Sequence, residues 1–405
     1  MLNGYKTLDD VDVSGKKVLL RLDLNSPIDP DTGDFLDDRR FISHRETIQE
    51  LTDSDAAVVC IAHQGRPGEE DFTTLKEHSR RLGEIVGKDV AYVDDIFGSN
   101  AQNAVKNLSG GDVIILENLR FYSEEVLKRP ADVQAKTVMV QRMSPLFDLF
   151  VNDAFAVAHR SQPSVVGFPM VLPSCIGRLM EKEVRIIGGI LENPEHPISF
   201  VLGGTKADDS LRVAEKALEH GTDRILTGGV VANIFLAAKD YRIGEPNIEF
   251  IRGKKMVDQI EVAKRLLDRY EDRIVLPRDL AVEKSGERSE IDVGDLPTNY
   301  KISDIGAKTV ELYKKLINES KTSFANGALG IFEDKKFAYG TEEMIKAIAE
   351  SKSFSVIGGG HTVAAAKNLG VSDKITHVSS GGGACVDFLA GVKLPALEAL
   401  KSSGL

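Results

Sequence analysis

The sequence predicts an α/β protein of two lobes, each built on a mostly parallel sheet covered by helices. The first reason is length, because 405 residues exceed the ~250–300 at which a single hydrophobic core stops growing. The second is that short apolar runs recur along the chain and end in polar or glycine-containing turns. The third is that helix-like segments follow many of these runs, an alternation typical of parallel sheets. We therefore expect lobes at 1–172 and 193–391.

Five apolar runs predict the sheet of the first lobe. Strands that are buried on both faces of a parallel sheet read as nearly continuous apolar stretches. Each run is also followed by a helix-like stretch or by a loop that leads to one. We expect one strand in each of KVLLRLDLN, AAVVCIAHQGRP, DVAYVDD, DVIILENLRF and LFVNDAF.

A single helix is predicted between the lobes, at 173–192. Pro173 can occupy the first turn of a helix, where its missing N–H costs nothing, and the apolar residues after it recur at near-helical spacing. The second lobe then begins with a new series of apolar runs, with helical segments such as ADDSLRVAEKALEH between several of them. We expect its strands in PISFVLGGTK, RILTGGV, RIVLPRDLAV, SFSVIGGGHT and ITHVSSGGG.

Composition narrows the classes of function. Hydrophobic residues make up 42% and charged residues 28%, as in an ordinary soluble globular protein. The net charge of −11 disfavours nucleic-acid and membrane-surface binding, so an anionic ligand requires a local cationic site. Cys60, Cys175 and Cys385 form no CxxC pair, which favours reduced thiols. Without a signal-peptide pattern or a run of ~18 apolar residues, we expect a cytoplasmic protein with no membrane anchor.

Cationic residues gather at the predicted strand ends of the first lobe. Planar guanidinium groups bind phosphate and carboxylate bidentately, so several of them at one sheet edge indicate a small ligand with several negative charges. A surface ion pair is the alternative for any single arginine, and a core or capping role is the alternative for the histidine. The residues concerned are Asp23, Asn25, Arg40, His63, Arg66, Arg120 and Arg160, with Asp153 given a structural role.

Glycines gather at the predicted strand ends of the second lobe, in LGGTK, TGGV, NGALG, GGGHT and SSGGGA. Glycine lets backbone N–H groups approach phosphate oxygens, and a helix N-terminus adds a favourable dipole. Tight turns without a ligand are the alternative for each site taken alone. Lys206, directly after GGT, can reach a bound phosphate or remain a solvated lysine. The chain has no GxxxxGK[ST] loop, no protein-kinase signature and no convincing GxGxxG.

Seven segments, in order and over nearly the whole chain, resemble phosphoglycerate kinase: RLDLNSP, HQGRP, LENLRF, NDAFAVAHR, GGTK, NGALGIFE and GGGHT. The resemblance implies two Rossmann-like lobes, with phosphoglycerate on the first and Mg-nucleotide on the second. It implies reversible phosphoryl transfer between ATP and the carboxylate of 3-phosphoglycerate, giving 1,3-bisphosphoglycerate and ADP in glycolysis and gluconeogenesis. It further implies a monomer that closes about the linker, with residues from about 392 to 405 packed back on the first lobe.

The resemblance also assigns roles to residues. In the first lobe, Asp23 and Asn25 would hold the glycerate portion, and Arg40 would bridge the carboxylate and the transferred phosphoryl group. The carboxylate and 3-phosphate region would be bound by His63, Arg66, Arg120 and Arg160. In the second lobe, Lys206 would steady the moving phosphoryl group and Glu333 would bind the ribose. The nucleotide phosphates would be met by Gly359, Gly360, His361 and Thr362.

Two positions depart from the common pattern of the family. Bacterial and eukaryotic members commonly read GGAKVADK and GGGDT, whereas this chain has Ser210 and His361 there, as the archaeal branch does. A neutral histidine is a poor ligand for Mg²⁺, so nucleotide phosphates and water are expected to supply most of its ligands.

Two other functions stay open. A dinucleotide-dependent oxidoreductase is also two-lobed and glycine-rich, although its fingerprint is missing here. A non-catalytic anion-binding protein would bind both ligands without turning them over, and Ser210 and His361 keep that reading open.

Overall fold

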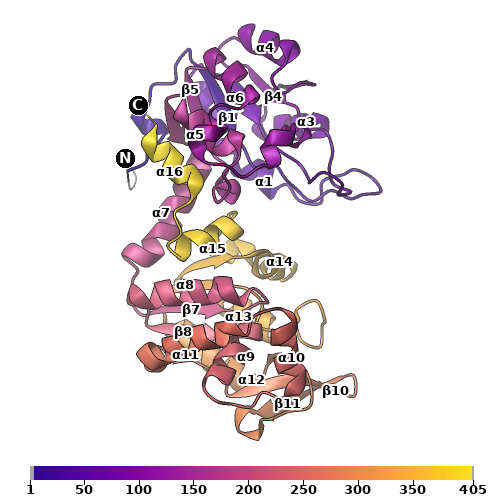
Figure 1. The fold of residues 1–405 in the computed structure, drawn as a ribbon, viewed down its shortest axis with the longest axis vertical. Coiled ribbons are helices and arrows are strands. Elements are labelled where there is room, and N and C mark those ends of the chain that lie inside the picture. The colour runs from indigo at the N-terminus through magenta and orange to yellow at the C-terminus, as the bar shows by residue number, and fades with distance from the viewer. Residues whose placement is uncertain (1–3, 404–405) are drawn as a thin grey trace. The chain divides into compact units, whose positions relative to one another are not determined.

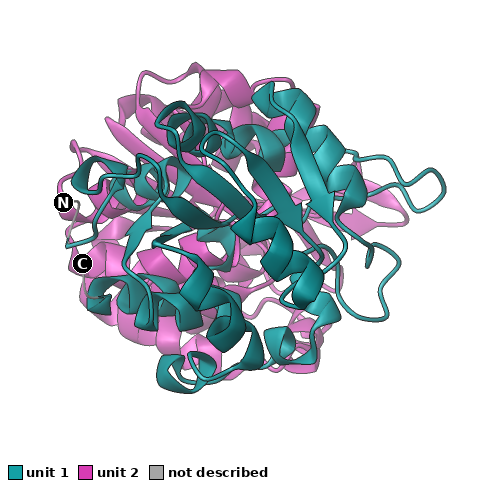
Figure 2. Ribbon diagram, turned by 90° about the horizontal axis from the view of Figure 1, so that it is seen from above, with its two compact units in different colours: residues 1–185, 393–405 teal, residues 186–392 magenta. Residues whose placement is uncertain are grey.

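The computed structural model describes residues 4–403 and divides into two compact units (Figures 1 and 2). Unit 1 comprises residues 1–185 and 393–405, and unit 2 comprises residues 186–392. Helix α7 (Arg178–Glu192) runs across the division. Within residues 4–403, every helix is too short or too polar to cross a lipid bilayer.

Unit 1 contains a six-stranded parallel sheet in the order β3-β4-β2-β1-β5-β6. Alternate residues of one strand enter different cores, because successive side chains point to opposite faces. On β1, Val18 and Leu20 belong to one hydrophobic cluster and Leu19 to the other. Both faces are thus covered, as the continuous apolar runs predict. The strands are β1 (Lys17–Arg21), β2 (Ala57–Ile61), β3 (Val90–Val93), β4 (Val113–Leu116), β5 (Leu149–Asn152) and β6 (Ser174–Ile176).

The helices of unit 1 are short, and the last of them comes from the C-terminal end of the described chain. Helix α16 (Pro395–Ser402) packs on two short helical turns, η6 (Pro163–Gly167) and η7 (Phe168–Met170), and is the yellow helix of unit 1 in Figure 1. The backbone N–H of Ala396 donates to the Ala158 carbonyl over 3.0 Å. The other helices are α1 (Arg39–Ser43), α2 (Arg45–Asp53), α3 (Lys76–Val86), α4 (Ser99–Lys106), α5 (Ala131–Gln134) and α6 (Val138–Met143).

The prediction of a helix from residue 173 is wrong at its start. Ser174–Ile176 form strand β6, which pairs in parallel with Phe150–Asn152 of β5. The Pro173 carbonyl accepts the N–H of Phe150 over 2.9 Å, so Pro173 leads into the strand. The helix begins only at Arg178. The three residues SCI gain a place at the sheet edge, and this tertiary pairing overrides the helical pattern around them.

Unit 2 repeats the architecture with a six-stranded parallel sheet in the order β15-β14-β13-β7-β8-β9. Helices α12, α13 and α14 share one core with this sheet, and Val201, Ala325 and Ile357 point into it. The strands are β7 (Ile198–Leu202), β8 (Arg224–Thr227), β9 (Ile274–Val275), β13 (Thr322–Asn326), β14 (Phe354–Gly358) and β15 (His377–Val378). The helices are α8 (Ala207–Glu219), α9 (Gly229–Ala238), α10 (Glu245–Gly253), α11 (Asp258–Tyr270), α12 (Ala307–Glu319), α13 (Tyr339–Glu350), α14 (Gly360–Asn368) and α15 (Gly383–Leu389).

The run RIVLPRDLAV does not form one strand of the parallel sheet. Proline has no N–H to donate to a ladder, and Pro277 separates β9 from β10 (Asp279–Lys284). Strand β10 instead pairs antiparallel with β11 (Glu287–Asp292) and β12 (Ile302–Ile305) in a separate three-stranded sheet.

Within residues 4–403, the three cysteines are buried and form no disulfide: Cys60 on β2, Cys175 on β6 and Cys385 on α15. Burial raises the pKa of the Cys60 thiol to about 12 and also raises the pKa of Cys175.

Candidate active site

Unit 1 brings the predicted cationic residues together at the carboxyl edge of its sheet. The pKa of Arg120 is lowered to about 10, by burial first and then by the positive charges of Arg160 and Arg21. The pKa of Arg160 is lowered by burial and then by Arg66, and that of Arg40 by burial and then by Arg160. These mutual repulsions show that the guanidinium groups lie close together.

Several of these charges are not neutralised by the protein. Within residues 4–403, no carboxylate lies within 4.0 Å of a guanidinium nitrogen of Arg120 or Arg160. Arg120 is 6% exposed and donates through Nη1 to the Gly65 carbonyl. Arg66 lies at the rim, where its side chain is 66% exposed and 3.7 Å from Glu69. An anionic ligand would relieve the repulsion within this cluster, so the cluster is suited to binding one.

Arg40 faces this cluster, whereas its neighbour Arg39 does not. Nη1 of Arg40 contacts Oδ2 of Asp23, whose side chain is 6% exposed. Arg39 bonds through Nε to Oδ2 of Asp37 over 2.8 Å, and its side chain is 50% exposed. Adjacent positions at the start of α1 thus have different environments.

Asn25 ties the loop after β1 to the loop after β2. Its Oδ1 accepts the N–H of Gly65 over 2.8 Å, and its own N–H donates to Oδ1 of Asp23 over 3.3 Å. Gly65 has φ +65°, and a Cβ there would lie 2.6 Å from the carbonyl oxygen of Asp71. Only glycine fits this close approach between two parts of the loop after β2.

His63 is held as a neutral imidazole with a defined tautomer. It is 2% exposed, and its Nδ1 lies 3.0 Å from Nη2 of Arg21. A guanidinium group can only donate, so Nδ1 must accept and the proton of His63 is on Nε2. Burial lowers the pKa of His63 well below its usual value, and the charges of Arg21 and Arg120 lower it further.

Arg21 was not identified from the sequence as a residue of this site. Its side chain is fully buried. Its Nε donates to Oγ of Ser164 over 3.0 Å, and Ser164 donates through Oγ and through its backbone N–H to the buried carboxyl of Glu125. Burial lowers the pKa of Arg21 to about 10, while the nearby Glu125 opposes that shift. An arginine inside the apolar run KVLLRL was the signal available in the sequence.

A second buried histidine joins the loop after β1 to helix α7. Nε2 of His44 accepts the backbone N–H of Asp23 over 3.0 Å, so Nδ1 carries the proton and donates to Oδ2 of Asp153 over 2.8 Å. Oδ1 of Asp153 accepts the N–H groups of Leu179 and Met180, in the first turn of α7, over 2.9 and 3.2 Å. Asp153 therefore caps α7, in keeping with a structural role, and His44 is a residue that the sequence did not indicate.

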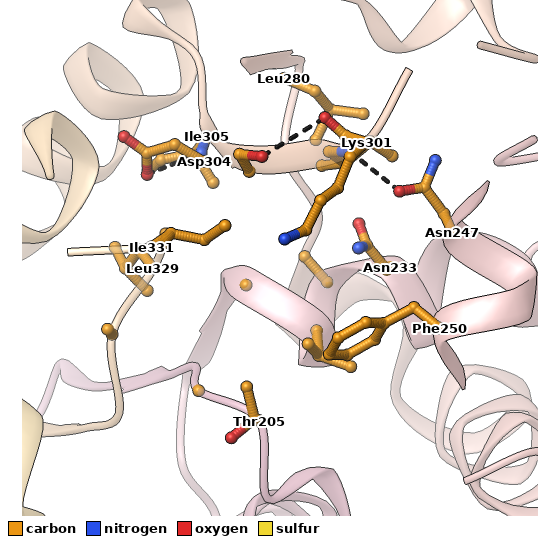
Figure 3. A pocket seen from close by; sticks show the side chains of 18 of the residues that line it. Thr205, Asn233, Asn247, Phe250, Leu280, Lys301, Asp304, Ile305, Leu329 and Ile331 are labelled. Atoms are coloured by element: carbon orange, nitrogen blue, oxygen red, sulfur yellow. Dashed lines mark hydrogen bonds between the residues drawn. The ribbon is translucent and has the colours of Figure 1, made fainter. Parts of the chain in front are cut away.

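Unit 2 has two adjoining cavities at the carboxyl edge of its sheet, of about 260 and 240 Å³. Gly204, Thr205 and His361 line both. The larger is mostly apolar, and Figure 3 shows it with Leu280, Ile305 and Leu329 among its lining residues. The smaller is a glycine-rich groove that is also lined by Lys206, Asp209, Ser210, Asn326, Gly327, Gly359, Gly360 and Gly382.

Glycines allow the turns of this groove to approach each other closely. Gly359 has φ +80°, and a Cβ there would lie 2.5 Å from Oδ1 of Asn326. Gly327 has φ +86° and lies against the backbone of Gly203. The N-termini of α8 and α14 open on the groove, so backbone N–H groups and helix dipoles favour an anion there.

The predicted nucleotide-site residues do not all reach these cavities. Lys206 and Gly360 line the groove, and Glu333 lines the larger cavity. Thr362 lines neither: it is 1% exposed, and its hydroxyl accepts the N–H of Gly327 over 2.8 Å. Its hydroxyl therefore holds the turn at Gly327, and a contact between Thr362 and the nucleotide phosphates stays a prediction. Ser210 is likewise buried, and its Oγ donates to the Gly203 carbonyl over 3.2 Å.

The groove offers oxygen atoms but no cluster of metal-binding side chains. Among the described residues, no group of three or more His, Cys, Asp and Glu is arranged to hold a metal ion. Nε2 of His361 lies 3.7 Å from Oε1 of Glu333, with both side chains more than half exposed. Oδ1 of Asn326 is buried without a hydrogen-bond partner in the part of the chain described, and Asp209 bonds to Arg212. Asn326 could have been singled out from NGALG as the polar residue that precedes two glycines.

Two parallel α/β units, one with a cationic cluster and the other with a glycine-rich groove, define the protein as a phosphotransferase for a small anionic substrate. A sequence model of the family "Phosphoglycerate kinase" matches residues 8–392. The chain belongs to the phosphoglycerate kinase family. The reaction of this family is the reversible transfer of a phosphoryl group between ATP and the carboxylate of 3-phosphoglycerate in glycolysis.

Named relatives and solved structures agree with this family. The chain is 52% identical to the phosphoglycerate kinase of Methanothermobacter thermautotrophicus over 98% of this chain and 97% of that protein. It is similar to the crystal structure of phosphoglycerate kinase from Pyrococcus horikoshii, with a TM-score of 0.88 and 44% identity over 98% of both chains. The enzyme from Coxiella burnetii follows with a TM-score of 0.82 and 30% identity over 98% of both chains. The archaeal matches are the more similar of these, as Ser210 and His361 suggest.

Proposed function

We propose that unit 1 binds 3-phosphoglycerate on its cationic cluster and that unit 2 binds the magnesium nucleotide in its two cavities. The observation on which this division rests is the set of mutually repelling guanidinium groups in unit 1. A ligand with one carboxylate and one phosphate has a charge of roughly −2.5 to −3 at pH 7, which suits an arginine cluster in which Arg120 and Arg160 make no ion pair within the described residues.

Different side chains of unit 1 would bind different parts of 3-phosphoglycerate. Asp23 and Asn25 would accept and donate hydrogen bonds at the hydroxyl of the glycerate. Arg66, Arg120 and Arg160 supply bidentate donors for the phosphate and carboxylate region. His63 adds a neutral N–H donor, because its Nδ1 is already occupied by Arg21. Arg40 now pairs with Asp23 and would turn to the substrate carboxylate and the transferring group.

The nucleotide would occupy the two adjoining cavities of unit 2. The base would enter the larger, apolar cavity, with Glu333 binding the ribose, and the phosphates would lie in the glycine-rich groove. Lys206 at the start of α8 and the backbone of Gly359, Gly360 and His361 would meet the phosphates. Thr362 would contribute through the turn it supports.

Catalysis on this substrate requires charge neutralisation and no general base. The attacking oxygen belongs to a carboxylate that is already ionised near pH 7. Arg40 and Lys206 would offset the negative charge of the transferring phosphoryl group. Mg²⁺ that arrives with the nucleotide supplies further neutralisation, and the groove offers it oxygen atoms of Asn326 and Asp209 rather than imidazole.

Three further features belong to the proposal. The two ligands must meet for transfer, so we expect the units to close about α7 and to exclude water from the acyl phosphate. We also propose that the protein acts as a monomer and that it is cytoplasmic. The free, buried cysteines are consistent with a reducing compartment.

A coupled assay tests the proposal, with 3-phosphoglycerate-dependent ADP formation from Mg-ATP as the readout. We expect turnover in the wild type and a loss of ~10³-fold in Arg40→Ala with ADP affinity unchanged. Arg39→Ala is the matched control, because Arg39 pairs with Asp37 at the surface, and it should stay within about twofold of wild type. A wild type that binds both ligands without turnover would instead support the non-catalytic reading.

A further inference from the structure

The larger cavity of unit 2 contains a buried polar atom that the protein leaves unpaired. Oδ1 of Asn233, on helix α9, has no hydrogen-bond partner among residues 4–403, and the residue is only 7% exposed. Asn233 lines this cavity, and Figure 3 shows its amide beside Lys301, Asn247 and Phe250. A buried acceptor without a partner lowers stability, so its retention calls for a partner from outside the chain.

The other buried polar groups of this cavity are already bonded. Nδ2 of Asn247 donates to the carbonyls of Ile243 and Tyr300 over 2.8 and 3.1 Å, and its Oδ1 accepts the N–H of Ile302 over 2.9 Å. Asp304 accepts from Arg288 and from the N–H of Gly340 over 2.9 and 2.8 Å. Within the described chain, Oδ1 of Asn233 is thus the buried side-chain oxygen of this cavity that makes no hydrogen bond.

The position of Asn233 places it at the base of a bound nucleotide rather than at its phosphates. The cavity meets the phosphate groove at Gly204, Thr205 and His361. In Figure 3, Phe250 lies between Thr205 and Asn233, and Asn233 lies near Lys301. A nucleotide whose phosphates lie in the groove would therefore extend its base toward Asn233.

We propose that Asn233 accepts a hydrogen bond from the exocyclic amino group of the nucleotide base and so selects a 6-aminopurine. This inference rests on the proposed nucleotide site of unit 2. The walls around the amide are mostly apolar, with Leu280, Ile302 and Leu329 among them, and suit the faces of a planar base. A site built to bond an N–H group discriminates against an analogue without it, because its own acceptor is then left unpaired.

The test compares nucleotides that differ only in the amino group. Dissociation constants of ADP and of purine riboside diphosphate, which lacks the 6-amino group, are measured by calorimetry for wild type, Asn233→Leu and Asn233→Ala. We expect wild type to bind ADP roughly 10- to 100-fold more tightly than the analogue. Both variants should bind the two nucleotides equally, within about twofold. Asn103→Leu, on the exposed face of α4 in unit 1, is the control and should keep the wild-type ratio.

Two results would overturn the inference: a wild type that binds both nucleotides alike, or variants that keep the preference for ADP. Kinetic measurements distinguish a failure of this inference from a failure of the proposed kinase function. If the wild type turns over Mg-ATP with 3-phosphoglycerate but binds ADP and the analogue equally, only the proposed role of Asn233 is excluded. A preference for ADP that depends on Asn233, without any turnover, would remove the proposed kinase activity and keep the base contact. Unchanged thermal unfolding of the variants would show that they fold.

Discussion

A few buried side chains of unit 1 have their protonation determined by their neighbours. Arg21 fixes the proton of His63 on Nε2, and burial keeps both His63 and His78 uncharged. His78 is 1% exposed, lies 3.1 Å from Oε1 of Gln64, and has its pKa lowered by burial to about 3. A neutral His63 avoids adding charge to a cluster already rich in arginine.

These histidines make stability depend on pH. Their pKa in the folded state is below the value of about 6.5 in the unfolded chain. Above that pH the histidines are neutral in both the folded and the unfolded state, so they do not make stability depend on pH. Below it only the unfolded state binds the proton, so stability falls with pH by about 1.4 kcal/mol per unit per histidine, down to about pH 3 for His78.

Urea unfolding of wild type and His78→Phe at pH 7 and pH 5 measures this effect. Phenylalanine can pack against Phe35 and Phe41, whose rings lie 4.7 and 5.8 Å from that of His78. We expect the wild type to lose about 2 kcal/mol more than the variant between the two pH values. Equal losses would mean that His78 takes up its proton in the folded state.

Alanine substitutions of Lys206 and Lys264 test whether the groove acts on the transferring phosphoryl group. Lys206 lines the groove at the start of α8, and Lys264 is exposed on α11. Lys206→Ala should lower kcat by ~10²-fold or more with little change in the KM for 3-phosphoglycerate, because the lysine acts on the transferring group. Lys264→Ala should match wild type. Steady-state kinetics that show a change in KM alone would make Lys206 a binding residue.

The sequence predicts residues that stand out at strand ends and misses those hidden in apolar runs. Arg66 and Arg120 could be chosen because charged groups follow predicted strands at the edge where ligands bind. Arg21, His44 and Asn233 could not be assigned, because their roles depend on contacts with residues far along the chain. Thr362 was assigned from its motif alone, and the sequence could not show that its hydroxyl accepts the N–H of Gly327 in a neighbouring turn.

At the scale of elements, the start of helix α7 determines how the end of strand β1 is held. The carboxylate of Asp153 caps the helix and bonds to His44, which in turn holds the backbone of Asp23. A Cβ at Gly177 would collide with this carboxylate, so the close approach of loop and helix requires glycine. The chain of bonds connects the helix between the units with a proposed substrate ligand.

Asp153→Ala should therefore weaken both stability and substrate binding. Its loss leaves the N–H groups of Leu179 and Met180 and the Nδ1–H of His44 without an acceptor, at a cost of about 3 kcal/mol. The KM for 3-phosphoglycerate should rise because the loop of Asp23 is released. Glu181→Ala in the same helical turn is the control, with a loss below about 1 kcal/mol, since Arg178 keeps Asp9 and Glu50. Equal effects of the two changes on KM would exclude the link through His44.

Element boundaries were predicted less well than the elements themselves. The apolar runs predict five strands of each parallel sheet because burial on two faces leaves a clear pattern, whereas β6 and β13 (Thr322–Asn326) were not among the predicted strands. Periodicity could not show that Ser174–Ile176 pair with β5, or that Pro277 ends β9 and lets β10 join an antiparallel sheet. Both outcomes depend on which strand is available as a neighbour.

For the whole molecule, the proposal assigns one ligand to each unit, and hydrogen exchange can test this assignment. We expect 3-phosphoglycerate to slow exchange in unit 1, around residues 21–25, 63–66 and 118–122. We expect Mg-ADP to slow exchange in unit 2, around 203–210 and 326–333. Mass spectrometry of peptides with each ligand alone gives the readout. Protection of unit 2 by 3-phosphoglycerate alone would reverse the assignment.

The burial of the native cysteines has a practical consequence for fluorescence measurements of domain closure. Thiol-reactive dyes attack the thiolate, which is scarce at Cys60 because burial raises its pKa to about 12. Cys175 and Cys385 are also buried, and neither forms a disulfide within the described residues. New cysteines in place of Asn103 on unit 1 and Lys264 on unit 2, both exposed, would therefore react with maleimide fluorophores while the native thiols stay intact. The natural chain can thus be labelled for energy-transfer measurements of domain closure without first removing its own cysteines.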